Sequence, residues 1–372
     1  MKRITIILLL AGVCCSMGAR ANQPLWFYVG TFTSEGAEGI SLCSLDTVTG
    51  DLAEVRIFKG IDNPNFLRLS PDRKFLYATT RGPQAADPDG GSVTAFCVRD
   101  NGDLQFINKR SSHGDDPCYA DISADGRWVA VANYGGGSVA LYPVADDGSL
   151  GPASSVVRHE GSGPLARRQS RPYSHSIRFM GDGDQLLAAD LGVDKLFAYS
   201  LDPSSGKLTS SPGASASLPP GSGPRHFDFT PDGRFIYVVN ELSSTVTVFE
   251  NKGGSLVQLQ DITTLPGDYT GVSYCADIHL SPCRNFLYAS NRGHNSVVVF
   301  SRDSSSGKIS PLAHIPVEGN WPRNFAMAPG GHFLLVANQR SHNITLFRME
   351  EGLPVYTGKS LNTKAPVCIE FL

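Results

Sequence analysis

The sequence is poor in charge and has almost no long apolar runs. Only 18 % of the 372 residues are charged, the formal net charge is −3, and the Lys and Arg residues are dispersed along the chain. Nucleic acids and anionic bilayers are bound by concentrated basic surfaces, so neither is an expected partner. Beyond the first residues no apolar stretch approaches the roughly 20 residues of a membrane-spanning helix, so we expect no membrane span.

Several motifs of common enzyme classes and metal sites are absent. The chain has no H-E-x-x-H, no P-loop and no G-x-S-x-G, which argues against zinc peptidases, nucleotide enzymes and serine esterases. No two of the eight cysteines have C-x-x-C spacing, so a zinc site has little support. We therefore expect no metal and no cofactor. The cysteines beyond the leader are expected mainly as buried thiols, with disulfides among some of them left open: Cys43, Cys97, Cys118, Cys275, Cys283 and Cys368.

The N-terminus has the three parts of a secretory signal peptide. Lys2 and Arg3 precede an apolar run over residues 4–13, and the small-residue pattern Ala19-Arg20-Ala21 follows. We predict that residues 1–21 are a signal peptide and that residues 22–372 form one exported, periplasmic or secreted domain. A lipid anchor at Cys14 or Cys15 is disfavoured because neither follows a small residue.

A repeat of about fifty residues organises the rest of the chain, which is rich in Gly (39) and Pro (24). Each copy has an apolar strand, a tight turn of Pro, Asp and Gly, and a second strand of Phe, Leu, Tyr and Val, as in a β-hairpin. A third strand and a weaker fourth strand follow. The six hairpins span residues 65–78, 118–132, 175–189, 225–238, 276–289 and 323–337.

The two ends of the chain supply a seventh unit. Residues 25–30 and 39–45 resemble second and third strands without a first strand, and residues 367–372 resemble a first strand with nothing after it. Joining them completes the unit and leaves no unpaired edge. The predicted fold is therefore all-β, a seven-bladed β-propeller with four antiparallel strands per blade, closed by the N- and C-terminal strands.

The phase of the repeat, meaning the position of each residue within its hairpin, also locates a candidate site. The start of a hairpin's first strand and the end of its second strand lie at the same mouth of a propeller, and the residues there differ chemically from blade to blade. They include three guanidiniums, a carboxylate and an imidazole, which suit a small anionic ligand. These candidate residues are His175, Arg225, Glu241, Arg292 and Arg323.

Polar residues also follow on the same first strands. His226, Asp277, His279 and Asn324 are expected chiefly to form hydrogen bonds between adjacent blades. Two of them, His226 and Asn324, are also candidate substrate-binding residues.

Several blocks together resemble the seven-bladed lactonase family. They are Pro64–Asp72, Ala132–Val139, Ala189–Asp194, Gly223–Asp228, Asn240–Leu242 and Ala276–His279. Known members include propeller-type 6-phosphogluconolactonases, and a fungal carboxymuconate lactonizing enzyme is a relative. The resemblance implies the same propeller and site residues matching His175, Arg225, Glu241 and one of Arg292 or Arg323. The chain departs at Tyr173, where many members have a second His.

The resemblance implies hydrolysis of a sugar-acid lactone, 6-phosphogluconolactone or a related aldonolactone. We expect His175 or Glu241 to take a proton from water and Arg225 to face the oxyanion, while Arg292 and Arg323 hold the substrate's anionic group. A muconate-type cycloisomerase and a noncatalytic exported propeller that binds a sugar acid or a protein are the alternatives. We expect a monomer or a weak homodimer.

Overall fold

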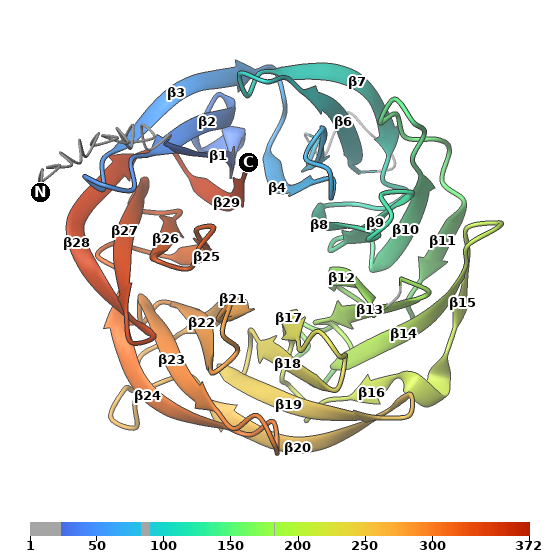
Figure 1. Cartoon of the computed structure of the whole chain (residues 1–372). Coiled ribbons are helices and arrows are strands. Elements are labelled where there is room, and N and C mark those ends of the chain that lie inside the picture. The colour runs from blue at the N-terminus through green and yellow to red at the C-terminus, as the bar shows by residue number, and fades with distance from the viewer. Residues whose placement is uncertain (1–23, 83–89, 182) are drawn as a thin grey trace, which may run out of the picture.

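The computed structural model describes residues 24–82, 90–181 and 183–372. Seven antiparallel sheets form a closed ring, as Figure 1 shows, and the predicted seven-bladed propeller is confirmed. The predicted signal peptide, with Cys14 and Cys15, lies outside the described residues.

The strands occupy equivalent positions in every blade. The innermost first strands are β4 (Pro64–Leu69), β8 (Pro117–Ile122), β12 (Ser174–Met180), β17 (Pro224–Phe229), β21 (Tyr274–Leu280), β25 (Pro322–Met327) and β29 (Pro366–Phe371). The second strands are β5 (Phe75–Thr80), β9 (Trp128–Asn133), β13 (Gln185–Asp190), β18 (Phe235–Asn240), β22 (Phe286–Arg292), β26 (Phe333–Asn338) and β1 (Leu25–Thr31).

The outer half of each blade continues the meander. The third strands are β6 (Ser92–Val98), β10 (Ser138–Pro143), β14 (Lys195–Asp202), β19 (Thr245–Lys252), β23 (Ser296–Arg302), β27 (Asn343–Glu350) and β2 (Gly39–Leu45). The outermost strands are β7 (Leu104–Ser111), β11 (Ser155–Arg158), β15 (Lys207–Ser210), β20 (Ser255–Thr263), β24 (Ile309–Pro316), β28 (Leu353–Asn362) and β3 (Leu52–Lys59). The remaining elements are a short strand, β16 (Ala216–Ser217), and two single-turn 3₁₀ helices, η1 (Thr33–Glu35) and η2 (Pro212–Ala214).

The last blade closes the ring as the ends of the sequence predicted. Its strand order is β29-β1-β2-β3, with Phe27 opposite Phe371 and Tyr28 opposite Glu370. The C-terminal strand is thus the innermost strand of a blade whose other three strands come from the N-terminus (Figure 1). This pairing covers the edge of β1 that would otherwise be open.

The core lies between blades. The second strands are buried on both faces, and β9, β18 and β26 are buried at every residue. Each of these strands packs against neighbouring blades, which explains their continuous Val, Leu, Phe and Tyr content. The outermost strands are largely exposed, as in β3 and β28.

A β-bulge interrupts every first strand near its start. In β17, for example, Pro224 pairs with Asn240 and His226 with Val239, so Arg225 is unpaired. A bulge re-aims the side chain of the extra residue. The residues left unpaired at these bulges are Asn65, Cys118, His175, Arg225, Ala276 with Asp277, Arg323 and Val367.

Two general expectations can be compared with the structure. Within the described ranges, no helix is long and apolar enough to cross a membrane. The six cysteines after the leader are free thiols, and four of them are buried.

Candidate active site

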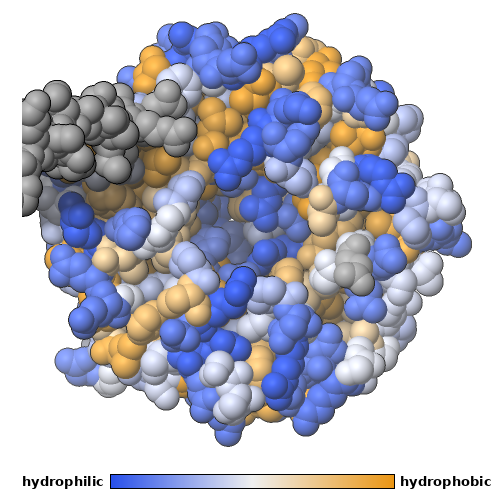
Figure 2. Space-filling view, in the orientation of Figure 1, coloured by the Kyte–Doolittle hydropathy of each residue, from blue (hydrophilic) through white to orange (hydrophobic). Residues whose placement is uncertain are grey.

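A polar hollow opens at the centre of the ring, and Figure 2 shows hydrophilic side chains around it. The side chains that line this channel form two cavities, one toward each mouth. The first, of about 440 Å³, lies where first strands begin and second strands end. We call it the bulge-side cavity. It is lined by Arg81, Asp116, Cys118, Tyr134, Arg168, His175, Glu241, Tyr274, Arg292, Trp321, Arg323, Gln339 and Arg340.

The structure brings together four of the five residues that the repeat phase selected. His175, Glu241, Arg292 and Arg323 line the bulge-side cavity. The fifth, Arg225, is only 2 % exposed and is not a lining residue, but it contacts Glu241, which is one. Five guanidiniums and two carboxylates line this cavity, so its charge favours an anionic ligand.

Glu241 organises the guanidiniums. Its Oε1 accepts a hydrogen bond from Arg168 at 2.5 Å, and its Oε2 accepts one from Arg292 at 2.6 Å. The Arg225 Nε lies 3.2 Å from Oε2. Burial alone would raise the pKa of Glu241, but Arg292, Arg225 and Arg168 lower it to about 2. Glu241 is therefore a carboxylate that anchors three arginines and has little tendency to accept a proton.

Arg225 is held from several sides. Its NH1 donates to the carbonyl oxygen of Ala276 and also contacts the ring of His226. The Nε is buried and, although near Glu241, makes no hydrogen bond within the described residues. Burial and the charges of Arg292 and Arg323 lower the pKa of Arg225 to about 9, which leaves the guanidinium charged at neutral pH.

Arg323 differs from Arg81, Arg168 and Arg292, which each pair with a carboxylate in this cavity. Its guanidinium lies over the ring of Phe32, 5.2 Å from the centroid, and no described carboxylate lies within 4.0 Å of it. Arg81, by contrast, pairs with Asp116 at 3.1 Å. Arg323 therefore presents a charge that the protein itself leaves unneutralised.

His175 lies at the bulge of β12 and is 4 % exposed. Its Nδ1 lies 3.5 Å from the Sγ of Cys118, and no described residue is a hydrogen-bond partner of its Nε2. Burial and the charges of Arg225, His226 and Arg323 lower the pKa of His175 well below 6.5. The imidazole is therefore neutral and has one nitrogen available.

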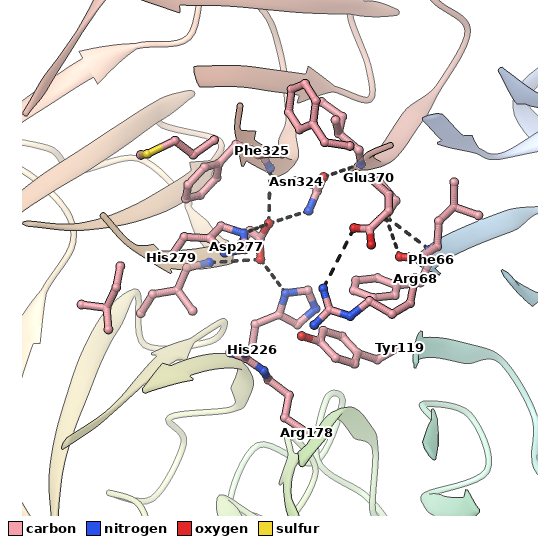
Figure 3. Close-up of a pocket in the computed structure, with 18 of the residues that line it drawn as sticks. Phe66, Arg68, Tyr119, Arg178, His226, Asp277, His279, Asn324, Phe325 and Glu370 are labelled. Atoms are coloured by element: carbon pink, nitrogen blue, oxygen red, sulfur yellow. Dashed lines mark hydrogen bonds and ion pairs between the residues drawn. The ribbon is translucent and has the colours of Figure 1, made fainter. Parts of the chain in front are cut away.

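His226 and Asn324 line a different cavity from Arg292 and Arg323. Both line a second cavity of about 450 Å³, toward the turns that end the first strands, which we call the turn-side cavity (Figure 3). Each follows a bulge residue, so its side chain projects one step further along the channel. The structure therefore places these two candidates in another cavity than Arg292 and Arg323, and their role in substrate binding stays a prediction.

The expected hydrogen bonds between blades are confirmed for His226, Asp277 and Asn324, whereas His279 bonds to Asp277 of its own strand. His226 Nδ1 lies 2.8 Å from Asp277 Oδ1, and Asn324 Nδ2 donates to Asp277 Oδ2 at 2.5 Å. His279 Nε2 lies 3.0 Å from the same Oδ2. These residues come from β17, β21 and β25, so the network joins three blades (Figure 3).

Sequence reasoning missed several residues of the bulge-side cavity. Asp116, Tyr274 and Trp321 each lie two residues before a bulge position, so extending the same phase count would have found them. Asp116 and Trp321 have positive φ, which aims these residues into the cavity mouth. Arg168 lies in the long connection between β11 and β12, which has no counterpart in the repeat, and nothing in the sequence indicated it.

Metal ligands are not gathered in the described part of the chain. No group of three or more His, Cys, Asp or Glu side chains there has the arrangement of a metal site. The donors of the bulge-side cavity are mostly guanidiniums, which repel cations.

Comparison with known proteins agrees with this fold. The model of the family described as lactonase, 7-bladed beta-propeller, matches residues 26–371. A 6-phosphogluconolactonase of Bacillus subtilis is 35 % identical over 349 residues, which cover 93 % of this chain and 97 % of that protein. A 6-phosphogluconolactonase of Formosa agariphila is 36 % identical over 337 residues, or 89 % and 93 % of the two chains.

A solved structure is similar to this protein in its three-dimensional fold as well as in sequence. The periplasmic gluconolactonase of Pseudomonas aeruginosa has a TM-score of 0.89 and 36 % identity, covering 94 % of this chain and 99 % of that one. Together these relatives support a lactonase function in the broad sense. The match over nearly the whole chain shows that this protein belongs to the lactonase family of seven-bladed β-propellers.

Proposed function

We propose that this protein hydrolyses an anionic sugar-acid lactone, 6-phosphogluconolactone or a related aldonolactone, in the bulge-side cavity. The observation that carries the proposal is the unpaired Arg323 guanidinium in the same cavity as the neutral imidazole of His175. A phosphate or carboxylate of the substrate would neutralise Arg323, with Arg292 beside it. The names of the relatives support the same reaction class.

The mechanism begins with His175. Its unpartnered Nε2 accepts a proton from water while the water oxygen attacks the lactone carbonyl carbon. His175 is a better base than Glu241, because both oxygens of Glu241 already accept hydrogen bonds from arginines. When the ring C–O bond breaks, the imidazolium returns the proton to the leaving alkoxide, and the product is the open-chain hydroxy acid.

Arg225 stabilises the oxyanion in this proposal. Its NH2 has no hydrogen-bond partner among the described residues, and its charge acts strongly on His175. A fixed guanidinium at the carbonyl oxygen stabilises charge that develops only in the transition state. Glu241 and Arg168 hold the arginine cluster in place. No step is assigned to a metal ion.

The proposed site of action is outside the cytoplasm, since the N-terminal residues have the pattern of a secretory signal. The Pseudomonas aeruginosa relative is described as periplasmic. Outside the cytoplasm, an unphosphorylated aldonolactone is an alternative to the phosphorylated substrate.

The test is hydrolysis of δ-6-phosphogluconolactone and of δ-gluconolactone by the mature protein with a chelator present, corrected for spontaneous hydrolysis. We expect turnover of at least one lactone. In Arg323→Ala we expect KM for the phosphorylated lactone to rise about tenfold, or about 1.4 kcal/mol, with a smaller change for the neutral lactone.

Arg127→Ala is the control, because Arg127 is exposed in the turn between β8 and β9 and pairs with Asp125. We expect this variant to leave both KM values unchanged. Acceleration of neither lactone would contradict the proposal and would favour the cycloisomerase or the noncatalytic binding protein.

A further inference from the structure

Arg225 rests on the imidazole of the next residue, His226. Its NH1 lies 3.2 Å from Nε2 and 3.4 Å from Nδ1 of that ring. NH1 is therefore in contact with both nitrogens of the ring. The bulge at Arg225 allows these consecutive side chains both to project into the channel.

The ring of His226 is itself fixed. It is 4 % exposed, and the rings of Tyr119 and His175 meet it edge to face, with centroids 5.0 Å and 5.4 Å away. Its Nδ1 donates to Asp277 Oδ1. Burial and the charge of Arg225 lower the pKa of His226 to about 3, so the ring is neutral and does not repel the guanidinium above it.

Asp277 is held more firmly than its neighbours. Its Oδ1 also accepts a hydrogen bond from the backbone N–H of Ile278 at 3.1 Å. Its Oδ2 accepts from Asn324, from His279 and from the backbone N–H of Phe325. Figure 3 shows the carboxylate at the centre of this network, between two blades. A carboxylate with this many donors has little freedom to rotate, so it fixes the plane of His226.

We propose that His226 and Asp277 are positioning residues for Arg225. The neutral ring of His226 supports the guanidinium from the side opposite the bulge-side cavity, and Asp277 sets the orientation of that ring. Apart from its ion pair with Glu241, Arg225 has one hydrogen-bond acceptor other than His226 among the described residues, the carbonyl oxygen of Ala276, so the ring of His226 is a main support of the guanidinium. The kinetic part of this inference rests on the proposed lactone hydrolysis.

The kinetic test compares His226→Leu and Asp277→Asn with Asp228→Asn. Asp228 is a matched control: it pairs with Arg178 and, like Asp277, accepts a backbone hydrogen bond from the next blade, at Leu280, but it does not contact Arg225. We expect kcat to fall about 10²-fold in His226→Leu and about tenfold in Asp277→Asn. KM should stay within about threefold, because Arg292 and Arg323 still bind the substrate.

The control should lose thermal stability to a similar extent with kcat within about twofold of the wild type. Equal losses of kcat in Asp228→Asn and Asp277→Asn would overturn the inference. So would a rise in KM with kcat unchanged, which would mean that His226 contacts the substrate directly. If His226→Leu does not fold, Asp277→Asn decides the kinetic comparison.

A second measurement does not depend on turnover. In ¹⁵N spectra of histidine-labelled protein, we expect His226 to be neutral with its proton on Nδ1, identified as the ring whose signals shift in Asp277→Asn and are still present in His279→Gln. The crystal structure of that variant should show the ring of His226 and the guanidinium of Arg225 displaced. A protonated ring, a proton on Nε2, or an unmoved Arg225 would overturn the inference even if the wild type hydrolyses no lactone.

Discussion

The chemistry of each polar residue in the channel depends on how many of its polar atoms already have a hydrogen-bond or ion-pair partner within the protein. Glu241 has both oxygens bound by guanidiniums, so it serves as an anchor. His175 keeps one ring nitrogen without a described partner, and Arg323 keeps its charge without a described carboxylate. At the scale of the residue, an available atom is therefore a better guide to function than the residue type.

The lowered pKa of His175 predicts the acid side of the pH–rate profile. Only the neutral imidazole accepts a proton from water, and its pKa lies well below 6.5 because of burial and of Arg225. We expect kcat/KM to stay level as pH falls from about 8 to 6.5 and to decline only at lower pH. Initial rates corrected for spontaneous hydrolysis provide the measurement.

A decline that begins above pH 6.5 would be inconsistent with His175 as the base. His175→Gln is the companion variant, since its amide has no titration in this range. The residual kcat/KM of this variant should not fall at the pH at which that of the wild type falls.

Sequence predicted single residues where they occupied a repeat position. His175, Glu241, Arg292 and Arg323 were found because they vary at positions that are otherwise equivalent. Arg168 could not be found in this way, because it comes from a connection outside the repeat and reaches Glu241 only through the tertiary fold.

The turn between the third and fourth strands is a repeated contact between blades. The carbonyl oxygen of Gly307 accepts a hydrogen bond from Tyr237 of the preceding blade at 2.9 Å, and a Cβ at Gly307 would lie 2.2 Å from Phe235. The same Tyr-to-Gly hydrogen bond joins Tyr28 to Gly102, Tyr77 to Gly148 and Tyr288 to Gly352. At the scale of the element, the glycine is required both by its positive φ and by the close approach of the aromatic ring.

We therefore expect Gly307→Ala to destabilise the protein more than Gly253→Ala. Both residues have positive φ, but a Cβ at Gly253 would meet nothing within 4 Å. The strained φ costs about 1–2 kcal/mol in each variant, and the contact with Phe235 adds about 1–3 kcal/mol in Gly307→Ala alone. Midpoints of urea unfolding measure the difference, and equal midpoints would show that the ring of Phe235 moves aside freely.

The bulges are the feature of the elements that sequence reasoning did not predict. Pro64, Pro117, Pro224, Pro322 and Pro366 each precede an unpaired bulge residue, so a periodic Pro was the available signal. A hairpin pattern predicts which strands pair, but a one-residue shift in register changes neither the apolar pattern nor the turn.

Across the whole molecule, the first strands place a ring of charges of mostly alternating sign around the channel. Arg68 pairs with Asp121 of the next blade, and Arg178 pairs with Asp228 of the next. One residue near the end of each of the seven first strands belongs to this ring, six of them ionisable and one, Ala326, uncharged. In chain order they are Arg68, Asp121, Arg178, Asp228, His279, Ala326 and Glu370. Signs cannot alternate fully around an odd number of blades, and the uncharged Ala326 takes the place where two like charges would otherwise meet.

Closure of the ring predicts that the C-terminal strand is essential. Removing residues 366–372 would open the edge of β1 and abolish two hydrogen bonds, from the Ile369 N–H to Asn324 Oδ1 and from the Leu69 N–H to Glu370 Oε1. We expect this truncation to lose the cooperative thermal transition and to be digested rapidly by protease. Deletion of Leu372 alone is the control and should keep both properties. A truncated protein with the wild-type transition would contradict this role of β29.

The sequence by itself determined the propeller, its seven blades and the way in which the ring closes, because these follow from a local hairpin pattern repeated along the chain. It also placed His175, Glu241, Arg292 and Arg323 at one mouth, because strand direction relates positions within each hairpin. Only the tertiary structure decided that Arg225 is buried and that His226 and Asn324 belong to the turn-side cavity. Those outcomes depend on a bulge of one residue and on contacts between blades, which no local pattern encodes.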